Sequence, residues 1–398
     1  MKCYLIAKKL GHSFSKLIHN ALSDYSYEYK ELEETELDGF FKEKDFDGLN
    51  VTIPYKETVI DYLDFISPEA EKIGAVNTVV NRRGKLYGSN TDYYGFLYQV
   101  KESGAEISGK DVVILGRGGA AKTVSCVCSD MGAKSVRFLT RDSNPEEFYD
   151  GQIVVNATPV GMFPDTGKSV VDITKFTKCE AVLDLVYNPA NTKIILDAKK
   201  MGIKTSNGLG MLVAQAKKAG EIFTDCEIPD VKIDEIKKEI EFKTKNIVLV
   251  GMPGCGKTTV GKKLASLTGK EFCDSDDVIS FLGRTPQEII VSDGEKAFRK
   301  IETDVLSDLC KKSGLVIATG GGCVTVEENH DVLRQNGYVV FIERELENLE
   351  TEGRPLSTDI GKLWQKREPL YRGVADMCVK SAENPDKTAE EILKRIKG

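Results

Sequence analysis

The sequence predicts an α/β fold, and three observations support this. The segment KDVVILGRGGAAKTVSCVCSDMG (110–132) has the order of an apolar strand, a glycine-rich turn and a helix. The segment KNIVLVGMPGCGKTTVGKKLASLTG (245–269) repeats that order. Strands and helices also alternate between and before these two segments. Both strands are short continuous apolar runs, which are typical of parallel strands covered on both faces.

Length and composition restrict the classes of protein. At 398 residues the chain predicts two or three domains. The net charge of −7 disfavours a nucleic-acid-binding surface. Charged residues interrupt each apolar stretch before the roughly 20 residues that a membrane-spanning helix needs, so no membrane partner is expected. The ten cysteines include no CxxC pair, which favours reduced thiols and a cytoplasmic location.

The other elements follow from local patterning. Strands expected before the first glycine-rich turn cover residues 4–7, 48–53 and 75–81. Strands expected after it cover residues 136–140, 153–156 and 181–185. A helix over 191–201 should end at Gly202. A further amphipathic helix should follow Pro229, with an apolar side made of Val231, Ile233, Ile236 and Ile240.

The motif GMPGCGKT (251–258) matches GxxxxGK[ST] and lies between a strand and a helix. Glycines allow backbone N–H groups to surround phosphates, and a helix N-terminus favours the negative charge. Lys257 should reach the β- and γ-phosphates, and the Thr258 hydroxyl should ligate Mg²⁺. The pattern predicts an ATP and Mg²⁺ site. Its expected residues are Gly251, Gly254, Gly256, Lys257, Thr258 and Thr259.

Five short motifs follow this turn. They are CDSDD (273–277), FRKIE (298–302), TGGG (319–322), GRPLS (353–357) and KREPLYR (366–372). In this order, behind a phosphate-binding turn, residues 245–398 closely resemble shikimate kinase. The resemblance implies a P-loop α/β domain, similar to the nucleoside monophosphate kinases, that phosphorylates shikimate with Mg-ATP.

The resemblance also implies roles for single residues. Asp276 would hold and deprotonate the acceptor hydroxyl, and Asp274 would bind Mg²⁺. Planar guanidinium groups suit carboxylates, so Arg299 and Arg367 would hold the substrate carboxylate, with Glu302 bracing Arg299. The remaining implied site residues are Gly320, Gly321 and Gly322 beside the substrate ring and Arg354 in a lid over the phosphates.

The first glycine-rich turn, GRGGAAK (116–122), gains meaning from its neighbours. Four motifs precede it: HSFSKLIHN (12–20), GLNVTIPYKE (48–57), GAVNTVV (74–80) and GSNTDYYGF (88–96). Three follow it: NATPVGM (156–162), DLVYNP (184–189) and NGLGMLVAQA (207–216). Together they resemble shikimate dehydrogenase over nearly all of residues 1–241. The implied fold is an α/β substrate lobe followed by a Rossmann-like dinucleotide-binding lobe.

The chemistry of ketone reduction points to particular side chains. Hydride addition produces an alkoxide that needs a proton, and Lys56 is a suitable donor if burial lowers its pKa. By resemblance, Asp92 orients Lys56 and the substrate hydroxyl. The resemblance implies substrate contacts from Ser13, Ser15, Thr52, Asn77, Tyr187 and Gln215. It implies cofactor contacts from Gly116, Gly118, Gly119, Ala120 and Arg141.

The cofactor choice depends on FLTRDSN (138–144), the end of the strand after the turn. In the family an arginine here holds the 2′-phosphate of NADP, and Arg141 is retained. Asp142 replaces the usual threonine, and an acidic residue at such a position can accept a hydrogen bond from the ribose 2′-hydroxyl of NAD. NADP(H) is the expected cofactor, and NAD stays open. Arg117 replaces a usual alanine and adds a cation near the pyrophosphate.

The two halves would act on one metabolite. The first would reduce 3-dehydroshikimate to shikimate, and the second would convert shikimate to shikimate 3-phosphate. The sequence thus predicts a bifunctional enzyme with small-molecule substrates. Alternatives are a quinate-using oxidoreductase in the first half or a degenerate binding module in either half. The expected boundaries are 1–98 with 212–241 for the substrate lobe, 99–211 for the dinucleotide lobe, 242–246 for a linker and 247–398 for the kinase-like domain.

Overall fold

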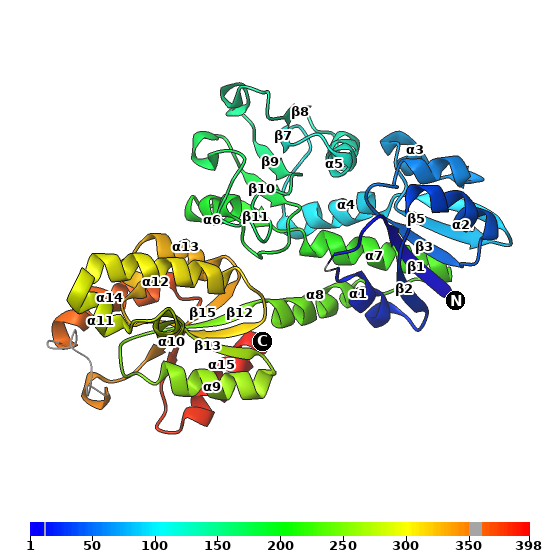
Figure 1. Ribbon diagram of the computed structural model, residues 1–398. Coiled ribbons are helices and arrows are strands. Elements are labelled where there is room, and N and C mark those ends of the chain that lie inside the picture. The colour runs from blue at the N-terminus through cyan, green and yellow to red at the C-terminus, as the bar shows by residue number, and fades with distance from the viewer. Residues whose placement is uncertain (12, 350–359) are drawn as a thin grey trace. The chain divides into compact units, whose positions relative to one another are not determined.

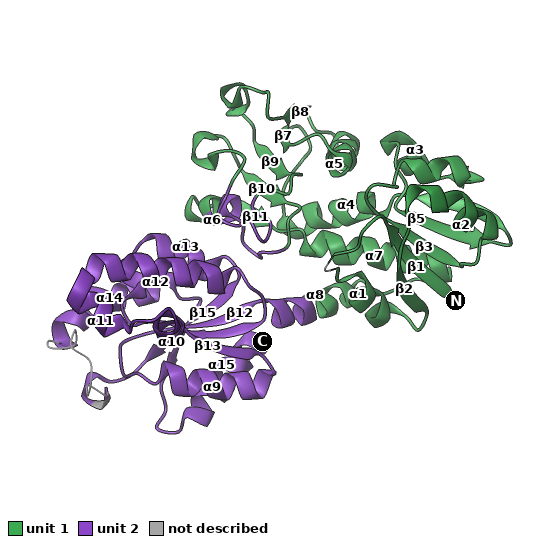
Figure 2. Ribbon diagram, viewed as in Figure 1, with its two compact units in different colours: residues 1–160, 169–187, 197–237 green, residues 161–168, 188–196, 238–398 purple. Residues whose placement is uncertain are grey.

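The computed structural model describes residues 1–11, 13–349 and 360–398. The chain divides into two compact units (Figures 1 and 2). Unit 1 consists of residues 1–160, 169–187 and 197–237. Unit 2 consists of residues 161–168, 188–196 and 238–398. Both units have helices packed around sheets, which confirms the predicted α/β fold class.

Unit 1 begins with a mixed six-stranded sheet in the order β2-β1-β3-β5-β6-β4. Its strands are β1 (Lys2–Ala7), β2 (Ser26–Glu31), β3 (Gly48–Val51), β4 (Phe65–Ile66), β5 (Thr78–Arg82) and β6 (Lys85–Ser89). Its helices are α1 (Ser15–Leu22), α2 (Leu37–Glu43) and α3 (Pro68–Ile73). β3 is parallel to β1 and antiparallel to β5, and its residues Leu49 and Val51 are buried in the core.

The second sheet of unit 1 is fully parallel, in the order β11-β10-β9-β7-β8. Its strands are β7 (Asp111–Leu115), β8 (Ser135–Leu139), β9 (Ile153–Asn156), β10 (Ala181–Asp184) and β11 (Lys204–Ser206). The helices of this part of unit 1 are α4 (Thr91–Ser103), α5 (Gly119–Asp130) and α7 (Leu209–Thr224), while α6 (Lys193–Lys200) begins in unit 2 and ends in unit 1. The central strand β7 has β8 on one side and β9 on the other, so ligands are expected outside its carboxyl end.

Unit 2 contains a parallel five-stranded sheet in the order β13-β14-β12-β15-β16. Its strands are β12 (Asn246–Val250), β13 (Glu271–Asp274), β14 (Leu315–Ala318), β15 (Gly337–Glu343) and β16 (Met377–Lys380). Its helices are α9 (Lys257–Thr268), α10 (Ser275–Phe281), α11 (Pro286–Asp293), α12 (Glu295–Cys310), α13 (Glu328–Arg334), α14 (Ile360–Val374) and α15 (Pro385–Lys397). The central strand β12 is buried along its whole length.

Short 3-10 helices complete the described elements. They are Glu34–Glu36, Thr58–Tyr62, Pro145–Phe148, Ile173–Lys175, Cys323–Thr325 and Leu346–Asn348. No helix among the described residues is long and apolar enough to cross a membrane.

Two expectations near residue 240 need correction. In place of a linker over 242–246, helix α8 (Val231–Thr244) continues to Thr244, and β12 begins at Asn246. Ion pairs one helical turn apart, including Lys243 Nζ to Glu239 Oε1 at 2.6 Å, support the helix to its end. The apolar side of α8 also lacks Val231, which is 57% exposed at the first helical position, while Ile233, Ile236 and Ile240 are buried.

Candidate active sites

Unit 1 contains a cavity of about 410 Å³. The residues around it come from β1, β2, β3, α1, α4, α5, α7 and the loops after β1, β3 and β10, and Asn77 lies directly before β5. It brings together most of the substrate and catalytic residues expected from the sequence. Its lining includes Ser13, Ser15, Thr52, Lys56, Asn77, Asp92, Ala120, Tyr187 and Gln215.

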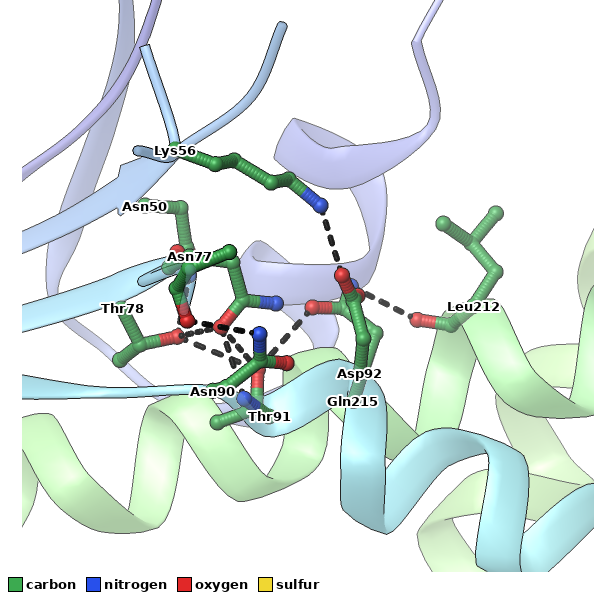
Figure 3. Close-up of polar contacts among 10 residues, drawn as sticks. Asn50, Lys56, Asn77, Thr78, Asn90, Thr91, Asp92, Leu212 and Gln215 are labelled. Carbon is green, nitrogen blue, oxygen red and sulfur yellow. Dashed lines mark hydrogen bonds and ion pairs between the residues drawn. The ribbon is translucent and has the colours of Figure 1, made fainter. Parts of the chain in front are cut away.

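Lys56 and Asp92 form an ion pair in this cavity (Figure 3). Lys56 lies in the loop after β3, and Asp92 lies in the first turn of α4. The distance from Lys56 Nζ to Asp92 Oδ2 is 2.6 Å, and the two side chains are 28% and 18% exposed. The pair is therefore accessible from the cavity, and Asp92 fixes the direction of the ammonium group. This arrangement suits proton donation to an oxygen bound beside Lys56.

A buried hydrogen-bond network positions two amide side chains of the cavity (Figure 3). The Thr91 backbone N–H donates to Asn77 Oδ1 at 2.7 Å, and Thr91 Oγ1 donates to Gln215 Oε1 at 3.3 Å. Thr78 Oγ1 also donates to Asn77 Oδ1. Because a backbone N–H can only donate, it fixes which Asn77 atom is the oxygen. The Asn77 amide nitrogen therefore remains to bind an acceptor.

Asn50 extends this network on the strand side. Its Nδ2 donates to the Asn77 carbonyl at 3.2 Å and to Thr78 Oγ1 at 3.1 Å, while its Oδ1 accepts from Tyr27 Oη at 2.8 Å. The expected site residues did not include Asn50, Thr78 or Thr91. A polar Asn50 within the apolar strand GLNV was the one local signal available, since a buried amide requires partners.

The serine turn lies at another side of the cavity. Ser13 Oγ donates to Ser15 Oγ at 3.0 Å, and the Ser15 backbone N–H donates to Ser13 Oγ at 3.2 Å. The Tyr29 hydroxyl donates to the Ser13 carbonyl and fixes the turn. Burial raises the pKa of Tyr187, so its phenol stays neutral and can donate a hydrogen bond. These hydroxyls suit a bound carboxylate or ring hydroxyl.

The turn from β7 into α5 fits the phosphates of a dinucleotide. Gly116 has φ +97°, and a Cβ there would lie 2.7 Å from Thr158 Cγ2, so the chain itself requires glycine. Gly118 and Gly119 are different, because a Cβ at either would meet no protein atom within 4 Å. Gly118 is the N-cap of α5 and makes no side-chain cap. Both residues are exposed at the start of α5, and a helix N-terminus favours negative charge, so this turn is suited to act as a phosphate cradle.

Unit 2 contains a second cavity, of about 290 Å³. It gathers the predicted phosphate turn, the two aspartates and both arginines. Its lining includes Gly254, Gly256, Lys257, Thr258, Thr259, Asp274, Asp276, Arg299, Glu302, Gly320, Gly321, Gly322 and Arg367. Gly251 lies behind the turn, where a Cβ would be 2.6 Å from the Ile342 carbonyl oxygen. Arg354 lies outside the described residues.

Hydrogen bonds from its own residues stabilise the predicted phosphate-binding turn (251–258). Lys257 is 8% exposed, and its Nζ donates to the carbonyls of Gly251 and Met252, both at 2.9 Å. Thr258 Oγ1 donates to Asp274 Oδ2 at 2.8 Å. Mg²⁺ prefers such hydroxyl and carboxylate oxygens, so Thr258 and Asp274 suit an octahedral ion that keeps several waters.

Burial sets the chemistry of Asp276. Its Oδ1 is buried and has no hydrogen-bond partner among the described residues. Burial, followed by the nearby Asp274 carboxylate, raises the pKa of Asp276, and Lys257 and Arg299 oppose the rise. A carboxylate with a raised pKa and an unpartnered oxygen at a cavity wall is suited to accept a hydroxyl proton.

The two arginines reach the same cavity from α12 and α14. Arg299 Nη1 pairs with Glu302 Oε2 at 2.7 Å, and Arg299 Nη2 pairs with Glu295 Oε1 at 2.9 Å. Arg367 Nη1 donates to the Gly321 carbonyl at 3.4 Å, and its Nε is buried with no partner among the described residues. Both guanidinium groups thus keep donors that can bind an anion.

The glycines of TGGG permit close packing of these groups. A Cβ on Gly320 would lie 2.5 Å from Glu302 Oε1, and a Cβ on Gly322 would lie 2.1 Å from Arg299 Nη2. A Cβ on Gly321 would lie 2.6 Å from Pro253 Cδ. A side chain at any of these three positions would therefore displace the group that it meets.

Two family models match separate parts of the chain. Residues 5–79 match the family model of the shikimate dehydrogenase substrate binding domain, and residues 253–397 match that of shikimate kinase. The shikimate dehydrogenase (NADP(+)) of Clostridium perfringens is 36% identical over 272 residues, which cover 60% of this chain and 97% of that protein.

Solved structures extend the similarity to the three-dimensional fold. The shikimate 5-dehydrogenase of Listeria monocytogenes, in complex with shikimate and NAD, is 33% identical with a TM-score of 0.55 and covers 60% of this chain and 96% of its own. The shikimate 5-dehydrogenase of Thermus thermophilus, in complex with NADP(H) and shikimate, is 30% identical with a TM-score of 0.53 and covers 60% of this chain and 99% of its own.

Proposed function

We propose that this chain, which belongs to the shikimate dehydrogenase family and carries a shikimate kinase domain, catalyses two consecutive reactions. Unit 1 reduces 3-dehydroshikimate to shikimate with NADPH. Unit 2 phosphorylates the 3-hydroxyl of shikimate with Mg-ATP. The observation that supports this most directly is that two separate cavities each hold groups for the same metabolite, a hydroxylated ring with a carboxylate.

In the reductase, a bound nicotinamide supplies the hydride. Lys56 donates a proton from Nζ to the oxygen that forms on the reduced carbon, and Asp92 holds Nζ toward the cavity. Asn77 and Gln215, fixed by Thr91, bind ring hydroxyls. Ser13 and Ser15 bind the substrate carboxylate. The cradle at Gly118 and Gly119 holds the cofactor phosphates.

In the kinase, bound Mg-ATP supplies the phosphoryl group. Lys257 and the turn 251–258 hold its phosphates, and Thr258 and Asp274 hold Mg²⁺. Arg299 and Arg367 bind the shikimate carboxylate and orient the ring. Asp276 accepts the proton of the 3-hydroxyl as that oxygen attacks phosphorus. The raised pKa of Asp276 makes it a stronger base than an exposed aspartate.

The test is to incubate the full chain with 3-dehydroshikimate, NADPH, Mg²⁺ and ATP and to detect shikimate 3-phosphate by mass spectrometry. Lys56→Ala should lower the reduction rate by roughly 10²–10⁴-fold, the usual contribution of a positioned proton donor, and leave phosphorylation of added shikimate unchanged. Asp276→Asn should lower the phosphorylation rate and leave the reduction of 3-dehydroshikimate unchanged. In each variant, the reaction that is retained shows that the chain is still folded.

Other outcomes would change the proposal. Turnover of quinate at a rate comparable to shikimate would favour a broader oxidoreductase in unit 1. Either variant leaving its own reaction intact would contradict the role given to that residue. Absence of one reaction in the unmodified chain, with retained ligand binding in calorimetry, would identify that half as a binding module.

A further inference from the structure

Two arginines near the carboxyl ends of β7 and β8 make no ion pair with any residue that the structure describes. Arg117 lies in the turn after β7, and Arg141 lies in the turn after β8; both are exposed. Among the described residues, no carboxylate lies within ion-pair distance of either guanidinium. Arg137, on β8 itself, is different, because its Nη2 pairs with Asp150 Oδ1 at 2.6 Å.

The turn after β8 presents its two central residues outward. The Ser143 backbone N–H donates to the Thr140 carbonyl, and Ser143 Oγ accepts from the Thr140 backbone N–H at 3.0 Å. The turn is thus closed between Thr140 and Ser143. Arg141 and Asp142 occupy its tip with opposite charges, so this turn alone offers a bound anion little net attraction.

Arg117 adds a second cation on the same side. Its guanidinium carbon lies 6.0 Å from the centre of the Phe138 ring, and Phe138 is next to the last residue of β8. Phe138 packs against the cluster that includes Val124 of α5, so Arg117 lies on the α5 face of the sheet. The arginine therefore leans from the phosphate cradle toward β8.

The strand order indicates on which side of β7 each end of a bound dinucleotide would lie. Leu185 and Tyr187, which follow β10, line the substrate cavity, so the end of the cofactor that reacts must lie on the β9 and β10 side of β7. The adenosine end must then lie on the β8 side. Arg117 leans toward that side, away from the reacting end.

We infer that Arg117 is a specificity-determining residue that binds the 2′-phosphate of NADP together with Arg141 and offsets the charge of Asp142. This inference rests on the proposed reductase function. It places the Arg117 cation beside the adenosine ribose instead of the pyrophosphate. Two cations and one carboxylate leave a net positive charge for a phosphate dianion, whereas Arg141 and Asp142 alone would not.

The test compares binding of NADP⁺ and NAD⁺ by calorimetry, with the full chain and with the P-loop of unit 2 saturated by MgADP. Arg117→Ala should weaken NADP⁺ about tenfold, the lower range for a charge-assisted hydrogen bond, and change NAD⁺ less than about twofold. Arg117→Lys should retain part of the preference. The kcat/KM ratio of NADPH to NADH should fall in parallel with the binding ratio.

Two further variants separate the contributions. Asp142→Asn should strengthen NADP⁺ binding several-fold by removing the opposing charge. Lys134→Ala is the matched control, because Lys134 is an exposed cation at the other end of β8 that pairs with Asp111 at 3.0 Å. It should leave both affinities within about twofold and show that loss of a charge from this lobe is not sufficient.

The contrary outcomes are distinct. Equal weakening of NADP⁺ and NAD⁺ by Arg117→Ala would place this cation on the pyrophosphate and overturn the inference. Unchanged binding of both would overturn it as well. If the unmodified chain bound neither dinucleotide and did not reduce 3-dehydroshikimate, the proposed function itself would fail.

Discussion

Glu302 on α12 is completely buried. Its Oε2 pairs with Arg299, and its Oε1 has no hydrogen-bond partner among the described residues. Burial raises the pKa of Glu302 to about 7, and the Asp276 carboxylate adds to the rise, while Arg299 and Arg367 oppose it. Near neutral pH the Glu302 carboxyl group, in the wall of the unit 2 cavity, therefore loses its proton and becomes negatively charged.

This pKa predicts a pH dependence of stability. Between about pH 4.5 and pH 7, folded Glu302 holds a proton that the unfolded chain releases. Its contribution to the free energy of unfolding is therefore fully present below about pH 4.5 and is lost as the pH rises to about 7. The loss is at most about 3 kcal/mol. Glu302→Gln should flatten the decrease in unfolding temperature of unit 2 between pH 5 and pH 8.

The measurement can follow unit 2 alone. Trp364 on α14 is the one tryptophan of the sequence, so its fluorescence reports this unit during thermal unfolding. Glu295→Gln is the control, since Glu295 also pairs with Arg299 but is 54% exposed. It should keep the pH slope. The same slope in Glu302→Gln and the unmodified chain would contradict the prediction.

Thr91 offers a second test at the residue scale. Its hydroxyl joins Asn77, Thr78 and Gln215, and it precedes Asp92 in α4. Thr91→Val keeps the shape but leaves these buried groups without a partner, which costs about 1–3 kcal/mol. The KM for 3-dehydroshikimate should rise about tenfold or more in steady-state assays. Thr91→Ser keeps the hydroxyl and should stay within about threefold; equal defects in both would refute this role.

At the element scale, the sequence predicted strands better than side-chain partners. The continuous apolar runs identified β7, β9 and β12 because buried parallel strands need apolar residues on both faces. The boundary at 242–246 was wrong, since local composition does not show that helix pairs continue α8 to Thr244. The positions of Asn50 and Arg117 could not be predicted, because both depend on neighbours from distant strands and turns.

A single methyl group added to Gly322, in the loop after β14, should weaken the binding of shikimate. In Gly322→Ala the new Cβ would lie 2.1 Å from Arg299 Nη2, so the guanidinium must move out of the cavity wall. Since Arg299 is proposed to bind the shikimate carboxylate, the KM for shikimate should rise at least tenfold. Initial rates of phosphorylation at varied shikimate measure this.

A matched glycine lies in the same unit. Gly373, near the end of α14, has nothing within 4 Å of its Cβ position and no positive φ. Gly373→Ala should leave KM unchanged and raise helix stability by at most about 1 kcal/mol. A normal KM in Gly322→Ala would show that Arg299 can relocate without loss of substrate binding.

At the scale of the whole molecule, each unit has cores of its own. One buried cluster packs around β12 and contains residues 247–392 only. The cluster around β7 contains residues 96–211 only. A ligand that binds one folded unit stabilises that unit by mass action, by about 2.7 kcal/mol at a concentration 100 times its Kd. The two cores therefore predict two responses to ligands.

We expect MgADP to raise the unfolding temperature reported by Trp364 and NADP⁺ to leave it unchanged. Calorimetry should show a second transition that NADP⁺ raises and MgADP does not. Lys257→Ala should remove the MgADP shift alone, because Lys257 lies in the turn of unit 2 that we propose to bind phosphate, where its Nζ donates to two carbonyls. If instead both ligands raised one common transition by similar amounts, the two cores would unfold as a single cooperative unit, and the two activities could not be perturbed separately by destabilising either half.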